Sequence, residues 1–421
     1  MNNRSGSITV LGSAGGVAQS FLSILNSVLT DKLDPLYPFL ITCKLYLIDW
    51  KQKDLSYYQK RFPNLKDHIV LREFDLKDTA IFSKHLVESK TYLVVDLSWA
   101  DTIEMVTCCD DLGIAYVNTA LENTWVDENE DIFEGFPLAE RMEQFEAKKN
   151  SFKNTSAIIG SGMNPGVVQW MAHELMRKSP DQLPDGCYIV EKDTSFYRDQ
   201  NEAKQNVVYT SWSPECFLDE AILSYPMFMK QGTPLYLYNQ PYELQFHVTL
   251  GDQSFSGCLM PHEEVYTLGR LYNMETGFIY QVNGHTTQLI RDNLSNPNEI
   301  WDFEMKVLDP NDAPLSGEDL VGILLVYEDK ERFMYNVMNN EDVFNKFKTN
   351  ATYFQVACGL YAGACSLLLD KLPKGIFYVD ELLVETENQY GNYLKQYMKA
   401  FITGENASSE GLILDRIKKW N

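Results

Sequence analysis

Basic residues and histidines are scarce in this sequence. Among its 421 residues, 36 Lys and Arg stand against 59 Asp and Glu, with six His, which gives a formal net charge of −23 at pH 7. This excess of negative charge opposes binding to nucleic acid and to anionic membranes, so neither is expected as a partner. The charge fits simple solubility, and it also fits the attraction of a cationic substrate.

Long apolar runs and paired cysteines are missing as well. No run approaches about 18 uncharged apolar residues, so no membrane span is expected. The N-terminus leads directly into a predicted strand at Ile8–Leu11 and leaves no room for a signal peptide, which favours a cytoplasmic protein. The eight cysteines include no Cys-x-x-Cys pair and no His cluster has ligand spacing, so we expect reduced core thiols and no metal.

The apolar residues that are present follow a clear alternation. With 45% hydrophobic and 13% aromatic residues, the chain can bury a sizeable core, and its length suggests two or three domains. Up to Gly160, short β-rich runs alternate with helical segments such as Thr79–Glu88 and Thr102–Leu112. The predicted strands are Ile8–Leu11, Leu45–Asp49, Ile69–Glu73, Tyr92–Asp96, Ala115–Asn118 and Ala157–Ile159. This alternation predicts an α/β fold with a Rossmann-type, doubly wound parallel sheet.

Beyond Trp170 the pattern changes to short, aromatic-rich strands. They are Tyr188–Glu191, Val207–Ser213, Leu235–Tyr238, Glu243–Leu250, Phe278–Val282, Ile323–Tyr327 and Phe333–Val337, the last two forming a hairpin. These strands indicate a second α+β domain with a mixed or antiparallel sheet. The apolar segment Tyr353–Leu369 predicts a helix. We therefore expect a Rossmann domain (1–165), an α+β domain for substrate binding and dimerisation (166–345), and a C-terminal helical segment (346–421) packed on the first domain.

A glycine turn follows the first predicted strand. It reads Gly-x-x-Gly-x-x-Ala up to Ala18, a variant of the dinucleotide-binding turn, in which glycines let the backbone approach a pyrophosphate. The turn residues assigned to the cofactor are Gly12, Gly15, Gly16 and Val17. The next strand ends in Asp49, beyond the usual ~20 residues because Gln19 to Thr42 is predicted to form a long helix and loop. These features predict NAD as cofactor, since Asp49 would repel the 2′-phosphate of NADP.

Polar residues recur where other predicted strands end. Asp75 and Asp96 lie at or just past such ends, and we assign them to the cofactor site. Thr119 is assigned to the rim where substrate would meet the nicotinamide, with Glu122 three residues further on; alternatively, the two form a capping box at a helix start. Asn164, in a Gly/Asn/Pro loop after another strand, is either a helix cap or a ligand contact.

A tryptophan flanked by acids stands out in the second half. Trp212 lies between Glu191 and Glu220 in the sequence, and an indole face near carboxylates suits an alkylammonium ion. Ordinary core packing of Trp212 is the alternative. His262, followed by Glu264, is a candidate proton shuttle, although a lone histidine is more often a packed or exposed residue.

These motifs, taken in order, resemble those of bacterial homospermidine synthase, within the saccharopine reductase-like group of NAD(P)-dependent enzymes. The resembling segments are Gly12 to Gln19, Thr119 to Trp125, Gly162 to Gly166, Glu191 to Thr194, Thr210 to Ser213, Glu220, His262 to Val265, Ser316 to Leu325 and Thr349 to Gly359. The resemblance implies that NAD takes a hydride from putrescine to give an imine, which a second diamine captures with loss of ammonia. The hydride then returns to the product. It also implies diamine substrates, with spermidine a further candidate, and a homodimer.

The resemblance also implies roles for individual residues. The carboxylates that would hold the diammonium ions are Glu191, Glu220 and Asp319. Trp212 would face the iminium centre, and Asn164 would position the reacting amine. His262 or Glu264 would move protons, and Glu122 would hold the distal ammonium or support the cofactor rim. Each of these roles is an expectation about this chain.

Two other functions remain open. One is NAD(P)H-dependent reductive coupling of an amine with a carbonyl substrate, as saccharopine reductase or carboxynorspermidine dehydrogenase performs. Those substrates carry carboxylates and need Arg or Lys anchors, for which Lys192 and Arg291 are the candidates. The other is a polyamine-binding protein that keeps the fold without catalysis.

Overall fold

The computed structural model describes residues 6–239 and 241–418, and the chain divides into two compact units. Unit 1 comprises Met1–Glu128, Glu140–Val167 and Phe354–Met398, and unit 2 comprises Asn129–Ala139, Val168–Tyr353 and Lys399–Asn421. The division between Val167 and Val168 lies close to the expected boundary at residue 165, but residues 129–139 of the expected first domain belong to unit 2. The expected C-terminal segment, 346–421, does not pack as one piece. Residues 354–398 belong to unit 1, whereas the end of the chain adds strands to the sheet of unit 2.

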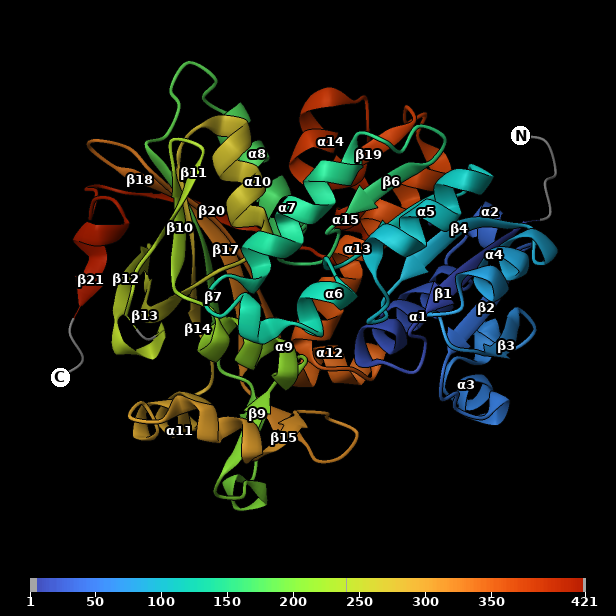
Figure 1. Cartoon of the computed structure of the whole chain (residues 1–421), viewed down its shortest axis with the longest axis horizontal. Coiled ribbons are helices and arrows are strands. Elements are labelled where there is room, and N and C mark those ends of the chain that lie inside the picture. The colour runs from blue at the N-terminus through green and yellow to red at the C-terminus, as the bar shows by residue number, and fades with distance from the viewer. Residues whose placement is uncertain (1–5, 240, 419–421) are drawn as a thin grey trace. The chain divides into compact units, whose positions relative to one another are not determined.

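Unit 1 is built on a parallel sheet of seven strands in the order β19-β6-β5-β4-β1-β2-β3 (Figure 1). The strands are β1 (Ser7–Leu11), β2 (Lys44–Asp49), β3 (Ile69–Glu73), β4 (Thr91–Asp96), β5 (Ala115–Asn118), β6 (Ser156–Ile159) and β19 (Gly375–Tyr378). Every pairing in this sheet is parallel. The predicted Rossmann-type α/β fold is confirmed, and the strand order reverses between β1 and β4, where such folds bind ligands.

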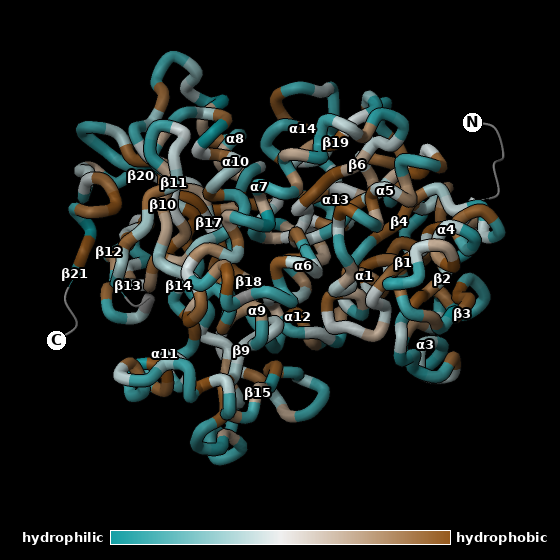
Figure 2. The backbone as a smooth tube through the Cα atoms, in the orientation of Figure 1, coloured by the Kyte–Doolittle hydropathy of each residue, from teal (hydrophilic) through white to brown (hydrophobic). Residues whose placement is uncertain are grey.

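Two helices of unit 1 begin at an aspartate that caps them. The carboxylate of Asp78 accepts the Ile81 N–H at the start of α4, and that of Asp101 accepts the Glu104 N–H at the start of α5. The helices are α1 (Gly16–Val28), α2 (Tyr37–Leu40), α3 (Leu55–Arg61), α4 (Thr79–Glu88), α5 (Thr102–Leu112), α6 (Thr124–Asp127), α14 (Val379–Glu385) and α15 (Tyr390–Tyr397), with most of α7 (Pro137–Lys149) and α13 (Ala351–Leu369). Figure 2 shows apolar residues along β1 and β2, which supply buried positions of the core.

Helix α13 contradicts the expectation that the chain has no apolar run long enough to span a membrane. By length and composition, α13 could cross a membrane, so the chain does contain such a run. In its most apolar stretch 72% of the residues are buried in the protein, as in a core helix of a globular domain.

Unit 2 contains a ten-stranded mixed sheet, ordered β20-β18-β17-β7-β14-β13-β12-β21, with β10 and β11 added beside β14. Its strands are β7 (Gly186–Asp193), β10 (Met227–Lys230), β11 (Thr233–Tyr236), β12 (Gln245–Leu250), β13 (Gln253–Met260), β14 (Glu275–Gln281), β17 (Glu318–Val326), β18 (Glu331–Asn339), β20 (Ile402–Asn406) and β21 (Ile417–Lys418). Only β7 and β14 pair in parallel among the described strands of this sheet. The predicted hairpin is confirmed as β17 and β18.

Smaller elements complete unit 2. The two-stranded pairs are β9 (Val207–Thr210) with β15 (Glu304–Val307), and β8 (Phe196–Tyr197) with β16 (Leu315–Ser316). The helices are α8 (Val167–Arg177), α9 (Pro214–Leu218), α10 (Glu263–Tyr272), α11 (Gly284–Asp292) and α12 (Asn340–Phe347). In Figure 1, β9, β15 and α11 lie together at the lower edge of this unit.

The ten-stranded sheet has one apolar and one acidic face near its centre. Val190, Ile279 and Leu320 lie in one hydrophobic core cluster. Successive side chains of a strand point to opposite faces, so Glu191 on β7 points away from that core. Its register partner on β14 is Tyr280, which therefore shares its face. This arrangement places polar groups of distant segments side by side.

Candidate functional site

The glycine turn of unit 1 lies between β1 and α1, and close packing there requires a residue without a side chain. Gly12 has a positive φ of 66°, and a Cβ atom there would lie 2.2 Å from the carbonyl oxygen of Leu97, just after β4. The Gly15 N–H donates to the Gly12 carbonyl oxygen over 3.0 Å. Glycine at position 12 thus lets the loops after β1 and β4 meet at the edge of the sheet.

This turn leaves the first amides of α1 open to an anion. No side chain caps α1, and its first turn holds no acidic residue. Among the described residues, the N–H groups of Gly16, Val17 and Ala18 have no hydrogen-bond acceptor. Open amides at a helix N-terminus carry partial positive charge and suit a phosphate group.

Asp49 lies beside the turn at the end of β2, where the sequence motif places it. One carboxylate oxygen accepts the Ala14 N–H at 2.9 Å and the other accepts the Lys51 N–H at 3.2 Å. The sequence reasoning missed Gln52, whose amide donates to the Ser13 hydroxyl at 2.9 Å and so helps to hold the turn. Each oxygen of Asp49 keeps a further lone pair for a ribose hydroxyl.

The other two acids assigned to the cofactor already accept hydrogen bonds from the protein. Asp96 is buried and accepts hydrogen bonds from the Ser98 hydroxyl at 2.6 Å and the Tyr116 hydroxyl at 2.8 Å. Burial raises its pKa, although these hydrogen bonds oppose the rise. Asp75 accepts the Lys77 N–H at 2.9 Å. Their assignment to the cofactor stays a prediction.

The capping-box alternative for Thr119 and Glu122 is wrong. The nearest helix, α6, begins at Thr124, and its cap is Asn123, whose side chain accepts the Val126 N–H at 3.0 Å. The Glu122 N–H instead donates to the Thr102 hydroxyl at 3.0 Å. The local spacing matched a capping box, but this tertiary hydrogen bond holds the segment in a loop.

Asn164 lies in a tight loop between β6 and α8, and its roles as a helix cap or a ligand contact both stay predictions. A Cβ atom on Gly166 would lie 2.3 Å from the Gly162 carbonyl oxygen, so the loop closes tightly on itself. In residues 160–167, Asn164 is the one residue that is not buried. Thr119 lies against the same loop, since a Cβ atom on Gly162 would be 3.4 Å from the Thr119 Cβ. The loop after β5 therefore packs Thr119 against the loop that carries Asn164.

In unit 2, His262 stands between two glutamates. Its Nδ1 is hydrogen-bonded to Glu264, near the start of α10, and its Nε2 lies 3.7 Å from an oxygen of Glu220. Glu220 comes from a short π-helix, Asp219–Leu223, that follows α9. Glu264 is fully buried and His262 is nearly so, whereas Glu220 is partly exposed. Two residues from one segment and one from another thus form a single cluster of titratable side chains.

The surroundings shift the pKa values of this group toward neutral and alkaline pH. Burial raises the pKa of Glu220 to about 8, against the pull of His262. Burial also opposes charge on His262, but the carboxylates of Glu264 and Glu220 outweigh it and raise the pKa of the imidazole to about 10. Near neutral pH, His262 is therefore an imidazolium paired with Glu264, and Glu220 holds a proton that it releases slightly above neutrality.

Stacked aromatic rings connect this group to Trp212. The ring of His262 meets Phe278 edge-on at a centroid distance of 4.9 Å, and Phe278 stacks on Tyr280 at 5.7 Å. The indole N–H of Trp212 donates to the Tyr280 hydroxyl at 3.2 Å. Trp212 is partly exposed, so core packing alone does not describe it.

Three further acids lie around Tyr280. Glu191, Asp193 and Asp319 all act on its hydroxyl, and with burial as the leading cause they raise the pKa of Tyr280. We call the whole group the acid–aromatic cluster; it consists of Glu191, Asp193, Trp212, Glu220, His262, Glu264, Phe278, Tyr280 and Asp319. All of these residues belong to unit 2. The structure thus brings together every unit 2 residue that the sequence nominated for catalysis.

The sequence reasoning missed Asp193, Phe278 and Tyr280. Asp193 follows Glu191 at the two-residue spacing that keeps a strand side chain on one face. Phe278 and Tyr280 have the same spacing on β14. This periodicity was available in the sequence, but only the pairing of β7 with β14 shows that the two faces coincide.

No group of three or more His, Cys, Asp or Glu side chains in residues 6–239 and 241–418 is arranged to hold a metal ion. The carboxylates of the acid–aromatic cluster lie among aromatic rings and hydroxyl groups instead.

Comparison with known proteins gives only distant likenesses. No protein-family model matches the chain, and no curated protein is significantly similar to it. A myo-inositol dehydrogenase from Corynebacterium glutamicum is 6% identical with a TM-score of 0.34, over 80% of this chain and 75% of that one. A dTDP-glucose 4,6-dehydratase from Bacillus anthracis in complex with NAD is 9% identical with a TM-score of 0.25, over 37% of this chain. The match spans about half of the dehydratase, 54%. The enzyme WbmG from Bordetella bronchiseptica, also in complex with NAD, is 10% identical with a TM-score of 0.25, over 46% of this chain and 65% of that one. The fold assignment rests on the strand order and the parallel pairing described above.

Proposed function

We propose that the protein is an NAD-dependent enzyme that transfers an aminoalkyl group from one diamine to another, as homospermidine synthase does. The observation that carries the proposal is the acid–aromatic cluster. Acids nominated by resemblance from separate segments gather around Trp212 and His262. Within the described residues, Glu220 and Glu264 each form an ion pair with His262.

The chemistry of the cluster suits a substrate that carries ammonium groups. Carboxylates accept charge-assisted hydrogen bonds from an ammonium ion, and an indole face attracts it through the ring quadrupole. Lys192, a predicted anchor for a carboxylate substrate, points away. Its Nζ lies 5.9 Å from the ring centroid of Phe255, a member of the apolar core on the opposite face. The acid face therefore favours diamines.

Proton transfer falls to Glu220 in this proposal. A primary ammonium group must first lose a proton, because only the neutral amine has the lone pair that lets a hydride leave the neighbouring carbon. A carboxylate with a pKa of about 8 can accept that proton slightly above neutrality, and the nearby imidazolium of His262 stabilises the resulting anion. Asn164, at the tip of its loop in unit 1, is proposed to orient the reacting amine.

The residues of unit 1 fit NAD. The open amides of Gly16 and Val17 would hold the pyrophosphate, and Asp49 would accept hydrogen bonds from the ribose hydroxyls. Bound NAD supplies a reversible hydride acceptor. The carboxylate of Asp49 disfavours the 2′-phosphate of NADP because the two negative charges would repel each other.

Reductive coupling of an amine with a carboxylate-bearing carbonyl substrate is a second candidate, favoured by Arg291 on α11. Its charge lowers the pKa of the Cys258 thiol against the larger effect of burial. Cys258 pairs with Tyr280, so this arginine acts close to the acid–aromatic cluster.

The deciding experiment is incubation of the purified protein with NAD and putrescine, followed by polyamine mass spectrometry and an ammonia assay. Homospermidine and ammonia without net NADH are expected. Accumulation of NADH without a new polyamine would indicate a simple amine dehydrogenase. Absence of product from a protein that binds NAD would refute the transferase, and a keto-acid substrate with NAD(P)H would then separate reductive coupling from non-catalytic polyamine binding.

NAD binding can be measured separately. Trp50 and Trp99 follow β2 and β4, and their side chains are 78% and 62% exposed. Both lie at the carboxyl edge of the unit 1 sheet, so NADH bound there should quench tryptophan fluorescence by energy transfer. Trp50→Phe and Trp99→Phe identify the reporters, and unchanged fluorescence in all proteins would argue against NADH at this edge.

A further inference from the structure

Two fully buried aspartates face each other on neighbouring strands of unit 2. Asp193 on β7 is the register partner of Asp319 on β17, and neither side chain is exposed. Asp319 was nominated as a carboxylate that holds a substrate ammonium. Its burial is at odds with that role, because an amine binder must reach the substrate.

Two hydroxyl groups bridge these aspartates. An oxygen of Asp319 lies 2.6 Å from Thr352 Oγ1, which lies 2.8 Å from Ser211 Oγ, and this in turn lies 2.5 Å from an oxygen of Asp193. Thr352 immediately follows the start of α13, and Ser211 directly precedes Trp212. The four side chains therefore form one continuous chain of oxygen atoms.

Counting protons along this chain shows that one carboxyl group must be protonated. Three oxygen–oxygen contacts need three bridging protons, and each hydroxyl group has one proton to donate. Thr352 cannot donate to both Ser211 and Asp319. If both aspartates were ionised, one of the three contacts would have no bridging proton, and two oxygen lone pairs would face each other in a buried environment. Such a contact is strongly unfavourable. The missing proton must come from an aspartic acid.

The neighbours of Asp193 place the negative charge on that residue. Its second carboxylate oxygen accepts the Ser195 N–H at 2.8 Å. Asn340 donates to the Ser195 hydroxyl oxygen at 2.7 Å, which leaves that hydroxyl proton available for Asp193. Burial raises the pKa of both aspartates, and the Asp193 carboxylate adds to the rise at Asp319. The proton therefore belongs on Asp319.

We propose that Asp319 is a neutral carboxylic acid that donates a hydrogen bond to the Thr352 hydroxyl. Thr352 then donates to Ser211, and Ser211 donates to the Asp193 carboxylate. Asp319 acts as a positioning residue for Trp212. The chain anchors Ser211, whose carbonyl oxygen also accepts the Asn350 side-chain amide at 2.7 Å. The next residue, Trp212, is thereby held where its indole reaches Tyr280. The catalytic consequence of this positioning rests on the proposed amine chemistry, but the protonation state does not.

Infrared spectroscopy tests the protonation state without substrate or cofactor. A protonated carboxylic acid has a carbonyl stretching band that shifts on exchange into heavy water. We expect such a band in the full-length protein at neutral pH, lost in Asp319→Asn and kept in Glu220→Gln. The Glu220 band should vanish as pH rises through about 8. Absence of a band that depends on Asp319 would overturn the proposal, whatever the enzyme does.

Matched variants test the positioning role. Asp319→Asn keeps a donor toward Thr352, and Thr352→Ser keeps the hydroxyl, so both should leave the diamine KM and Trp212 fluorescence nearly unchanged. Asp319→Ala and Thr352→Val should lower kcat about tenfold or more and change Trp212 fluorescence. If Asp319→Asn raises the diamine KM about tenfold, as loss of an amine-binding carboxylate would, the proposal is overturned. Asp319→Asn remains informative even if the Ala and Val variants fail to fold.

Discussion

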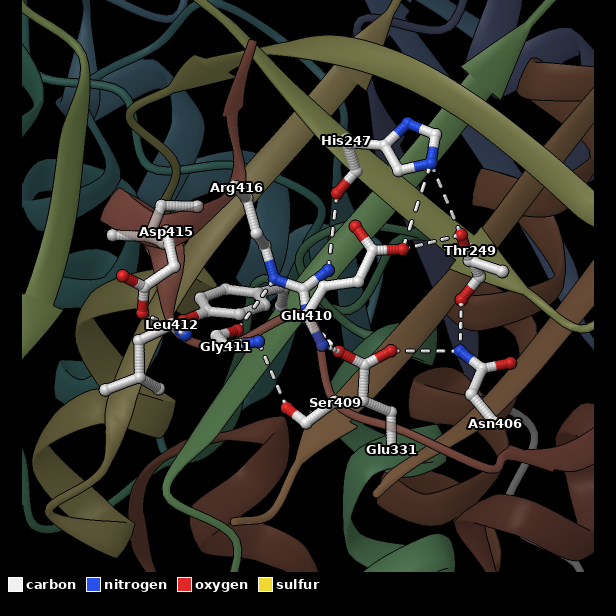
Figure 3. A network of polar contacts seen from close by, with 12 residues as sticks. His247, Thr249, Glu331, Asn406, Ser409, Glu410, Gly411, Leu412, Asp415 and Arg416 are labelled. Atoms are coloured by element: carbon white, nitrogen blue, oxygen red, sulfur yellow. Dashed lines mark hydrogen bonds and ion pairs between the residues drawn. The ribbon is translucent and has the colours of Figure 1, made fainter. Parts of the chain in front are cut away.

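Removing Arg416 should sharply destabilise unit 2, because this residue forms a completely buried ion pair with Glu331 (Figure 3). Its guanidinium donates to the Gly411 carbonyl oxygen at 2.9 Å and the His247 carbonyl oxygen at 3.3 Å. The central carbon of the guanidinium lies 5.4 Å from the ring centroid of Tyr188. These contacts fasten the end of the chain to the ten-stranded sheet.

The expected loss follows from the charge that is left behind. Arg416→Met keeps much of the side-chain volume but strands Glu331 in the interior, which costs about 3–5 kcal/mol. The double variant Arg416→Met with Glu331→Leu removes both charges and should lose less than Arg416→Met alone. It still leaves unsatisfied partners of the pair, among them Asn406, whose amide donates to Glu331 at 2.9 Å. Each such orphaned group costs about 1–3 kcal/mol.

Urea unfolding followed by circular dichroism measures these differences as shifts of the transition midpoint. Lys204→Met is the control, because its ion pair with Glu304 is exposed on both sides and is worth about 0–1 kcal/mol. The Arg416 effect should persist in high salt, since a buried pair is poorly screened. A loss no larger than that of Lys204→Met, or a double variant less stable than both single variants, would refute the reasoning.

Four further predictions concern the residues proposed to bind diamine and NAD. The rate with diamine should rise with pH to a plateau with an apparent pKa near 8, and Glu220→Gln should abolish this rise and lower the rate about 10²-fold. Because the pKa of Glu220 is raised in the folded protein, the folded state keeps a proton that the unfolded state releases between about pH 4.5 and pH 8. The free energy of unfolding should therefore fall as pH rises through this range, and thermal unfolding of Glu220→Gln should not show this fall. Trp212→Ala should lower kcat/KM about tenfold or more while Trp212→Phe loses less, and equal activity of all three proteins would remove Trp212 from the mechanism. Asp49→Asn should lower the ratio of the NADPH dissociation constant to the NADH dissociation constant at least about tenfold, as measured by tryptophan energy transfer. An unchanged ratio would exclude Asp49 as the residue that selects NADH over NADPH.

The parallel sheet of unit 1 could be predicted because its signals are local. Each β-rich run ends at a helix cap or a loop, and the predicted helices at Thr79–Glu88 and Thr102–Leu112 coincide with α4 and α5. Strand β19 was missed because its position depends on pairing with β6, more than two hundred residues earlier in the chain. No local pattern reports such a return of the chain, and the expected single C-terminal segment failed for the same reason.

The residue types of the candidate site could be predicted, but their environments could not. The resemblance nominated Asp319 as an amine-binding carboxylate. The strand register, however, places it opposite Asp193, and its side chain is fully buried. Thr119 and Glu122 met the spacing rule for a capping box, but Thr102 from a different segment bonds the Glu122 amide. In both cases a tertiary contact, which sequence spacing does not contain, decides the state of the side chain.

His262 shows how tertiary contacts change the charge state of a residue that its own segment does not distinguish. A lone histidine is more often structural, and nothing in its own segment beyond Glu264 distinguishes it. Glu220 changes this, because it brings a second carboxylate to the other ring nitrogen from a π-helix far away in the sequence. One glutamate then holds the imidazole as a cation, and the other, whose burial raises its pKa to about 8, can exchange a proton near neutrality. Exchanging the roles would fail, since Glu264 is fully buried and bonded to His262, whereas Glu220 is partly exposed to an incoming amine.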